Sequence, residues 1–149
     1  MRKVTVLLLA GVFAAMAADF SGTWKLDTAK SKVVGMPMPK EQTTTYTPKG
    51  SGYEYTAKGI SATGEPVTSG FTYRKDGEEV KTTGFPYWDA ITVTGGQAAK
   101  TTVHLKRAGK VIGTVTRTLS ADGKSLKLDG SLTLPDGKKA TYNYHYDKQ

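Results

Sequence analysis

Arg117 is the residue of this chain whose position most clearly suggests chemistry. It has the alternation phase of Val111, Val115 and Leu119, so its guanidinium projects toward the apolar side of its segment. No Asp or Glu shares the apolar phase of any segment that the alternation assigns. A buried charge without a partner is costly, and a bound carboxylate or phosphate would supply one through bidentate hydrogen bonds. Arg117 is therefore a candidate ligand-binding residue.

Aromatic side chains recur at alternating positions of other segments and fall on the apolar faces. They are Trp24, Tyr53, Tyr55, Phe71, Tyr73, Tyr142, Tyr144 and Tyr146. Such rings either line a cavity for an apolar or aromatic ligand or fill a small barrel completely. The candidate cavity residues are Arg117, Tyr53, Tyr55, Phe71, Tyr73, Tyr142 and Tyr144.

A second aromatic cluster, Phe85-Pro86-Tyr87-Trp88, falls in a predicted loop. Phe85, Tyr87 and Trp88 either form a portal or partner-contact surface or fold back to cap one mouth of a barrel. Met36 and Met38, in a long proline-rich connection, are candidates for a flexible lid.

The sequence shows no catalytic pattern. His104 and His145 fall on polar faces without a carboxylate motif around them, and there is no cysteine, so no structural zinc site is expected. No Gly-x-Ser-x-Gly elbow occurs. We expect a protein that is not an enzyme, with no catalytic residues, no metal site and no cofactor.

The segments that must position these residues all have the period of β-strands. Each is six to nine residues long, and turn signals such as Asp76-Gly77, Asp122-Gly123 and Asp136-Gly137 separate them. One polar and one apolar face predict antiparallel pairing, and closure protects the edges of a meander. The prediction is an all-β, single up-and-down barrel of eight to ten strands; ten strands favour a cavity and eight a packed core. The long connection, Thr28 to Glu41, allows a short helical turn at Thr28 to Val33.

The chain opens with the features of a secretory signal peptide. Arg2 and Lys3 precede an apolar run, and Ala15-Met16-Ala17 fits the cleavage rule. We predict cleavage after Ala17, with Ala18 as the alternative, and a barrel domain over residues 18–149. The expected location is the periplasm or the medium.

The formal net charge of the chain is +8. Lysines scattered through turns explain this surplus more simply than a dedicated polyanion site. No run of five like charges and no nucleic-acid motif occurs, so we expect no nucleic-acid partner. The leader is too short for a stable span and no later segment is apolar enough for one, which predicts no membrane span.

Several strings resemble known proteins. The start, Phe20-Ser21-Gly22-Thr23-Trp24-Lys25-Leu26, resembles the opening strand of lipocalins and fatty-acid-binding proteins, the calycin group. The extension through Asp27, Ala29, Lys30, Ser31 and Lys32, and the later Gly109 to Lys124 string, are similar to a family of small secreted bacterial lipocalin-like proteins. The resemblance implies fold and export. Fatty-acid-binding proteins hold a carboxylate with an Arg-x-Tyr pair on the last strand, where this chain has Tyr144-His145-Tyr146.

The resemblance also suggests a structural role for Arg117. In lipocalins a late arginine packs across the tryptophan of the Gly-x-Trp motif, so Gly22 and Trp24 are expected to close one barrel end, with Arg117 over Trp24. A ligand would then lie toward the other mouth. The leading hypothesis is a barrel that binds a small, apolar or amphiphilic ligand; the alternative is a protein-interaction or inhibitor barrel that acts through its loops and basic surface.

Overall fold

Ten β-strands make up the regular structure of the described residues, 19–96 and 98–149 of the computed structural model. They are β1 (Gly22–Val34), β2 (Glu41–Lys49), β3 (Gly52–Ile60), β4 (Pro66–Tyr73), β5 (Glu79–Lys81), β6 (Ala90–Thr94), β7 (Lys100–Arg107), β8 (Lys110–Leu119), β9 (Ser125–Thr133) and β10 (Lys139–Lys148). The predicted leader, 1–17, lies outside the described residues. No helix in the described part of the chain is long and apolar enough to cross a membrane.

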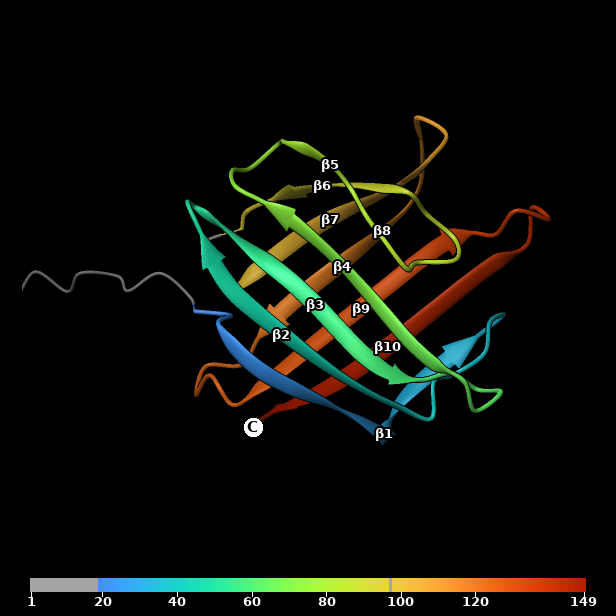
Figure 1. Ribbon diagram of the computed structural model, residues 1–149, viewed down its shortest axis with the longest axis horizontal. Helices are drawn as coiled ribbons and strands as arrows, with labels where there is room; N and C mark the ends of the chain where they lie inside the picture. The colour runs from blue at the N-terminus through green and yellow to red at the C-terminus, as the bar shows by residue number, and fades with distance from the viewer. Residues whose placement is uncertain (1–18, 97) are drawn as a thin grey trace, which may run out of the picture.

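The strands form one antiparallel sheet in the order β4-β3-β2-β1-β10-β9-β8-β7-β6-β5, which curls into a nearly closed barrel (Figure 1). Neighbours along this order are paired by ladders, two of which, β1–β10 and β7–β8, contain a register shift. The edge strand β4 is joined to the segment that follows the other edge strand, β5, by a single bridge between Gly70 and Thr83. The prediction of an all-β, up-and-down barrel of eight to ten strands is confirmed, with ten as the count in the described residues.

Successive connections of the meander lie at opposite ends of the barrel. The β1–β2, β3–β4, β5–β6, β7–β8 and β9–β10 connections lie at one end, on the right in Figure 1, which we call the mouth end. The other connections and residues 19–21 lie at the opposite end, which we call the closed end. Phe20 and Trp24 are fully buried at the closed end, as is Tyr73. The indole Nε1 of Trp24 donates a hydrogen bond of 3.0 Å to the Phe20 carbonyl oxygen.

The alternation of apolar and polar residues explains most of the strand orientations. Leu126 and Leu132 of β9 are 1% exposed and face the interior. Val111 is an exception, because a register shift opposite Leu105 and Lys106 inverts the phase at the start of β8. Ile112 therefore packs against the core while Val111 is exposed, and the prediction that Val111 faces inward is wrong.

The helical turn that the sequence allows at Thr28 to Val33 does not form, because β1 continues through this stretch. The register of β1 against β10 shifts between Asp27 and Lys32. Within the bulge, the Lys30 amide donates to Asp27 Oδ1 at 3.1 Å and Ser31 Oγ donates to the Asp27 carbonyl at 2.6 Å. Local bonds of this spacing also occur in a helical turn, but here the His145 amide donates to Ser31 Oγ at 2.9 Å and ties the bulge to β10.

Candidate functional site

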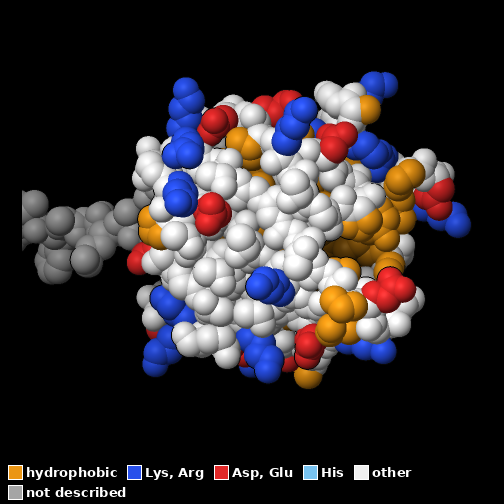
Figure 2. All heavy atoms as spheres, viewed as in Figure 1, with side chains coloured by type: hydrophobic (Ala, Val, Ile, Leu, Met, Phe, Trp, Pro, Cys, Tyr) orange, Lys and Arg blue, Asp and Glu red, His pale blue; other side chains and the backbone are white. Residues whose placement is uncertain are grey.

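A cavity of about 270 Å³ occupies the mouth-end half of the barrel. Figure 2 shows it as a hollow lined with hydrophobic side chains on the right of the molecule. The lining comes from three mouth-end connections and from the inner faces of the strands. It comprises Met36, Pro37, Pro39, Gln42, Tyr46, Tyr55, Ser61, Ala62, Val67, Ser69, Phe71, Gly84, Phe85, Pro86, Tyr87, Trp88, Ile91, Val103, Leu105, Val115, Arg117, Leu128, Tyr142, Tyr144 and Tyr146.

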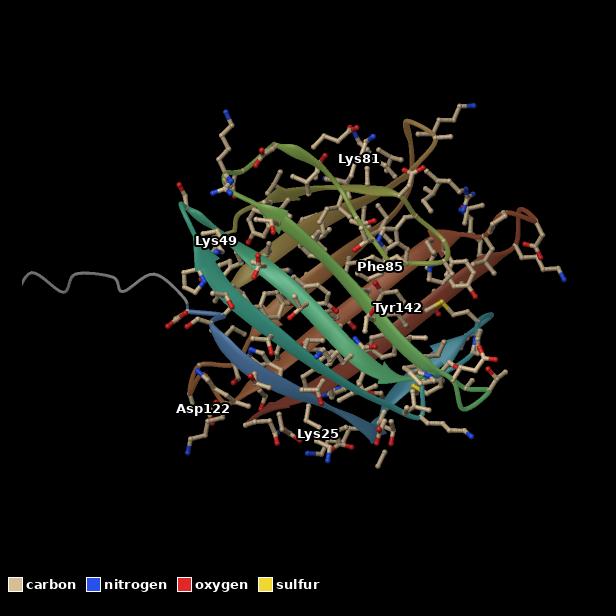
Figure 3. The ribbon with its side chains drawn as sticks, viewed as in Figure 1. Lys25, Lys49, Lys81, Phe85, Asp122 and Tyr142 are labelled. Atoms are coloured by element: carbon tan, nitrogen blue, oxygen red, sulfur yellow. The ribbon has the colours of Figure 1, made fainter. Side chains whose placement is uncertain are left out.

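Stacked aromatic rings make up much of this wall. Tyr55 and Phe71, on neighbouring strands, have ring centroids 4.7 Å apart and planes inclined by 12°. Phe85 stacks on Trp88 at 4.8 Å, and Phe85 also lies 6.1 Å from Tyr55. On β10, Tyr142 and Tyr144 stack on each other with ring centroids 4.7 Å apart. Figure 3 shows Phe85 and Tyr142 on the mouth side of the barrel interior. The cavity therefore has flat, polarizable walls.

Arg117 lies at the deep end of the cavity and is 2% exposed. Its Cζ is 4.1 Å from the ring centroid of Phe20 and 5.0 Å from that of Tyr46, which are cation–π distances. Its Nη2 donates to the Tyr73 hydroxyl at 3.3 Å. Its Nε is buried and has no hydrogen-bond partner among the described residues. Arg117 takes part in none of the ion pairs of the described residues, so this buried cation has no counterion among them.

The expected contact between Arg117 and Trp24 is wrong. The Trp24 ring has the Lys148 ammonium 5.6 Å from its centroid, while Arg117 covers Phe20 and Tyr46. Phe20 contacts both side chains: its carbonyl oxygen accepts from Trp24 Nε1, and its ring is the one that Arg117 covers. Gly22 and Trp24 lie at the closed end, and neither belongs to the cavity lining.

Burial keeps four of the cavity tyrosines protonated beyond the usual pH range of tyrosine. Burial raises the pKa of Tyr144 to about 12. Burial also raises the pKa values of Tyr55, Tyr142 and Tyr146, which lie further above the ordinary tyrosine value. A neutral phenol can donate a hydrogen bond to an anion. Gln42 Nε2 donates to the Tyr146 hydroxyl at 3.0 Å and fixes the position of this ring.

Most of the sequence-predicted residues meet at this site. Arg117, Tyr55, Phe71, Tyr142 and Tyr144 line the cavity, and so do Phe85, Tyr87 and Trp88 of the predicted loop. Two candidates are placed elsewhere: Tyr53 and Tyr73 pack at the closed end, beneath the cavity, where Tyr73 bonds to Arg117.

The strand β2 supplies lining residues that sequence reasoning missed. Gln42, Thr44 and Tyr46 share its inner face, but the surrounding threonines hide the alternation because both faces are polar. The pairing of Gly22 with Tyr46 places this ring beside the Gly-x-Trp strand. A search for alternating bulky residues opposite that motif would have found Tyr46.

The loop 82–89 closes the cavity against β4. The Gly70 amide donates to the Thr83 carbonyl at 3.0 Å, and the Thr83 amide donates to the Gly70 carbonyl at 2.9 Å. Gly84 has φ +76°, and a Cβ there would lie 1.9 Å from the Thr68 carbonyl oxygen, so only glycine fits this approach to β4. Thr82 Oγ1 and Trp88 Nε1 are buried without a partner among the described residues.

No protein-family model matches the chain, and no curated protein matches it. Among solved structures it is similar to zebrafish ileal bile acid-binding protein complexed with cholic acid, with a TM-score of 0.52 and 16% identity. The match covers 87% of this chain and 98% of that one. Likeness at this identity shows the fold, and it supports a calycin-type barrel.

Proposed function

We propose that this protein is a non-enzymatic carrier or receptor for a small, largely apolar ligand that bears an acidic group. The observation that carries the proposal is the cavity of about 270 Å³ whose one charged lining residue, among those described, is the unpaired Arg117. An apolar ligand body would bury the aromatic walls, and its acidic group would supply the missing counterion.

Two further observations support the proposal. The zebrafish neighbour, which has the same fold, was solved with cholic acid, an amphiphilic molecule with an acidic group. The rings of Phe85 and Trp88 stack on each other and pack against the core, so they face the cavity. A loop used to grip a protein partner would be expected to present such rings to solvent.

The first test is to purify the protein from its native compartment and analyse the extracted small molecules by mass spectrometry. The second is titration with anilinonaphthalene sulfonate, an apolar fluorescent anion. We expect binding that weakens about tenfold or more in Arg117→Met, since a tenfold change is about 1.4 kcal/mol and bonds to a charged group contribute about that much or more. Arg74→Met, which removes an exposed arginine near the closed end, should bind like the wild type.

No co-purifying molecule and no binding of the probe, dodecanoate or cholate would contradict the proposal. The protein-interaction alternative makes a different prediction: a pull-down from the exported fraction would capture a partner with the wild type and lose it with Trp88→Ala.

We also propose that the protein is exported, as the leader Met1 to Ala17 indicates. The mature chain should then begin at Ala18, which N-terminal sequencing of protein from the periplasm or medium checks. Recovery of the intact leader in the cytoplasmic fraction would contradict export while leaving the ligand proposal unaffected.

A further inference from the structure

We infer that the ligand is a flat aromatic monoanion of one or two fused rings, bound with its carboxylate or sulfonate at Arg117 and its rings between the aromatic walls. This inference rests on the proposed function and narrows the ligand class by size, by shape and by charge.

The size of the cavity limits the ligand. Pockets for drug-sized molecules have volumes of about 300–1,000 Å³, and the cavity here, at about 270 Å³, is smaller. An engineered cavity of about 150 Å³ in another protein accepts one benzene molecule. The space therefore suits one ring system of one or two rings with a small acidic substituent.

The shape of the walls favours a ring over a chain. The stack that joins Tyr55 to Phe71 and Phe85 to Trp88 forms one side, and the stack of Tyr142 on Tyr144 belongs to β10. Aromatic faces prefer offset-stacked or edge-on aromatic partners. A saturated ligand of the same volume would bury similar area without these contacts, so the walls select for aromatic character.

The charge of the lining favours a single negative charge. Arg117 is the one charged side chain of the lining within the described residues. One carboxylate or sulfonate balances one guanidinium. A phosphate monoester, with a charge near −2 at neutral pH, would leave a buried charge uncompensated and should be rejected.

The ligand orientation follows from depth. Arg117 is covered by Phe20 and bonded to Tyr73 of the closed end, whereas Phe85 and Trp88 belong to the mouth-end loop. The acidic group thus lies deep and the rings extend toward the mouth. Substituents on the ring edge opposite the acid would project between the loops, and substituents beside the acid would meet the packed floor.

The experiment is isothermal titration of the mature protein, stripped of any bound molecule, with naphthoate and four matched probes. These are decahydronaphthoate for aromatic character, naphthalene methanol for charge, naphthyl phosphate for a second charge, and dodecanoate for a chain. We expect naphthoate to bind about tenfold or more tightly than each of the others. Arg117→Met should remove the preference over naphthalene methanol, and Arg74→Met should keep it.

Because Arg117→Met could fail to fold, titration of Trp88→Leu provides a second, independent measurement. It leaves Arg117 in place and removes one ring of the wall, so the ratio of naphthoate to decahydronaphthoate affinity should fall severalfold. Equal or tighter binding of dodecanoate, decahydronaphthoate or naphthyl phosphate overturns the inference while the proposed function stands. Absence of binding by every probe overturns both.

Discussion

The two tryptophans of the chain lie in different parts of the barrel interior. Trp24 is fully buried at the closed end and is not part of the cavity lining, whereas Trp88 lines the cavity in a stack with Phe85. Trp24 Nε1 is hydrogen-bonded to Phe20, but Trp88 Nε1 is buried without a partner among the described residues. One ring therefore serves stability, and the other is placed to contact a ligand.

This division predicts opposite phenotypes for the same substitution. Trp24→Phe should lower the free energy of unfolding by on the order of 2 kcal/mol, because it leaves a void and an unbonded Phe20 carbonyl. Trp88→Phe should change it by less than about 1 kcal/mol, since it removes an unsatisfied donor and keeps a ring. Urea unfolding measures both.

Fluorescence titration with a non-fluorescent ligand completes this test. The ligand-induced change in tryptophan emission should persist in Trp24→Phe and disappear in Trp88→Phe. A signal that follows Trp24 instead would place the ligand at the closed end and contradict the site.

At the scale of elements, the weakest part of the wall is the seam between β4 and β5. Neighbouring strands elsewhere share ladders of three or more residue pairs, but here Gly70 and Thr83 form one isolated bridge. Thr83 Oγ1 adds a side-chain bond of 3.3 Å to the Gly70 carbonyl oxygen. The loop that follows Thr83 carries Phe85 and Trp88 into the cavity, so opening this seam would move part of the cavity wall.

Thr83→Pro should accelerate ligand exchange, because proline has no amide proton to donate to the Gly70 carbonyl oxygen. We expect a severalfold faster release of a bound anion in stopped-flow displacement and a loss of about 1 kcal/mol in stability. Thr83→Ala is the matched control: it keeps the amide bond and loses only the hydroxyl. If Thr83→Pro releases ligand at the wild-type rate, ligand does not pass through this seam.

The strands themselves were predictable from the sequence wherever one face is apolar. Leu126 to Leu134 and Tyr142 to Tyr146 show the period of two, and both rows face inward. The two departures arise at bulges: residues 28–31 of β1 stand opposite Tyr144 alone, and Ile112 is one extra residue of β8. An odd number of extra residues inverts the phase and leaves no trace in composition. The inward direction of Arg117 was predictable because it lies beyond the bulge of β8, in an uninterrupted stretch.

The partners of Arg117 were less predictable, because they come from three separate parts of the chain. Phe20 precedes β1, Tyr46 is on β2, and Tyr73 ends β4. Alternation gives the direction of a side chain but not its depth along the barrel axis. Depth depends on register and on the tilt of the strands, and for this reason Trp24 was the wrong partner to expect.

At the scale of the whole molecule, the interior is held together by neutral tyrosines around one cation. Burial raises the pKa values of Tyr55, Tyr142, Tyr144 and Tyr146 above the value of 10 that they have in an unfolded chain. Above pH 10 the unfolded chain therefore releases protons that the folded barrel retains. The slope of stability against pH is then negative, so stability is fully present below pH 10 and declines as pH rises further.

Alkaline unfolding of the ligand-free protein should thus be steep, and single Tyr→Phe variants should separate the contributions. The Tyr142 hydroxyl makes no hydrogen bond to another described residue, so Tyr142→Phe should be as stable as the wild type at neutral pH. Above pH 10 the free energy of unfolding of Tyr142→Phe should exceed that of the wild type by about 1.4 kcal/mol more for each pH unit. For Tyr144→Phe the difference in free energy of unfolding should grow in the same way only up to about pH 12, where the folded Tyr144 itself ionises. Urea unfolding at stepped pH, with phenolate absorbance recorded alongside, measures both curves. Parallel curves for wild type and variants through this range would show that these hydroxyls are solvated, and the cavity would then be wet rather than lined by protected rings.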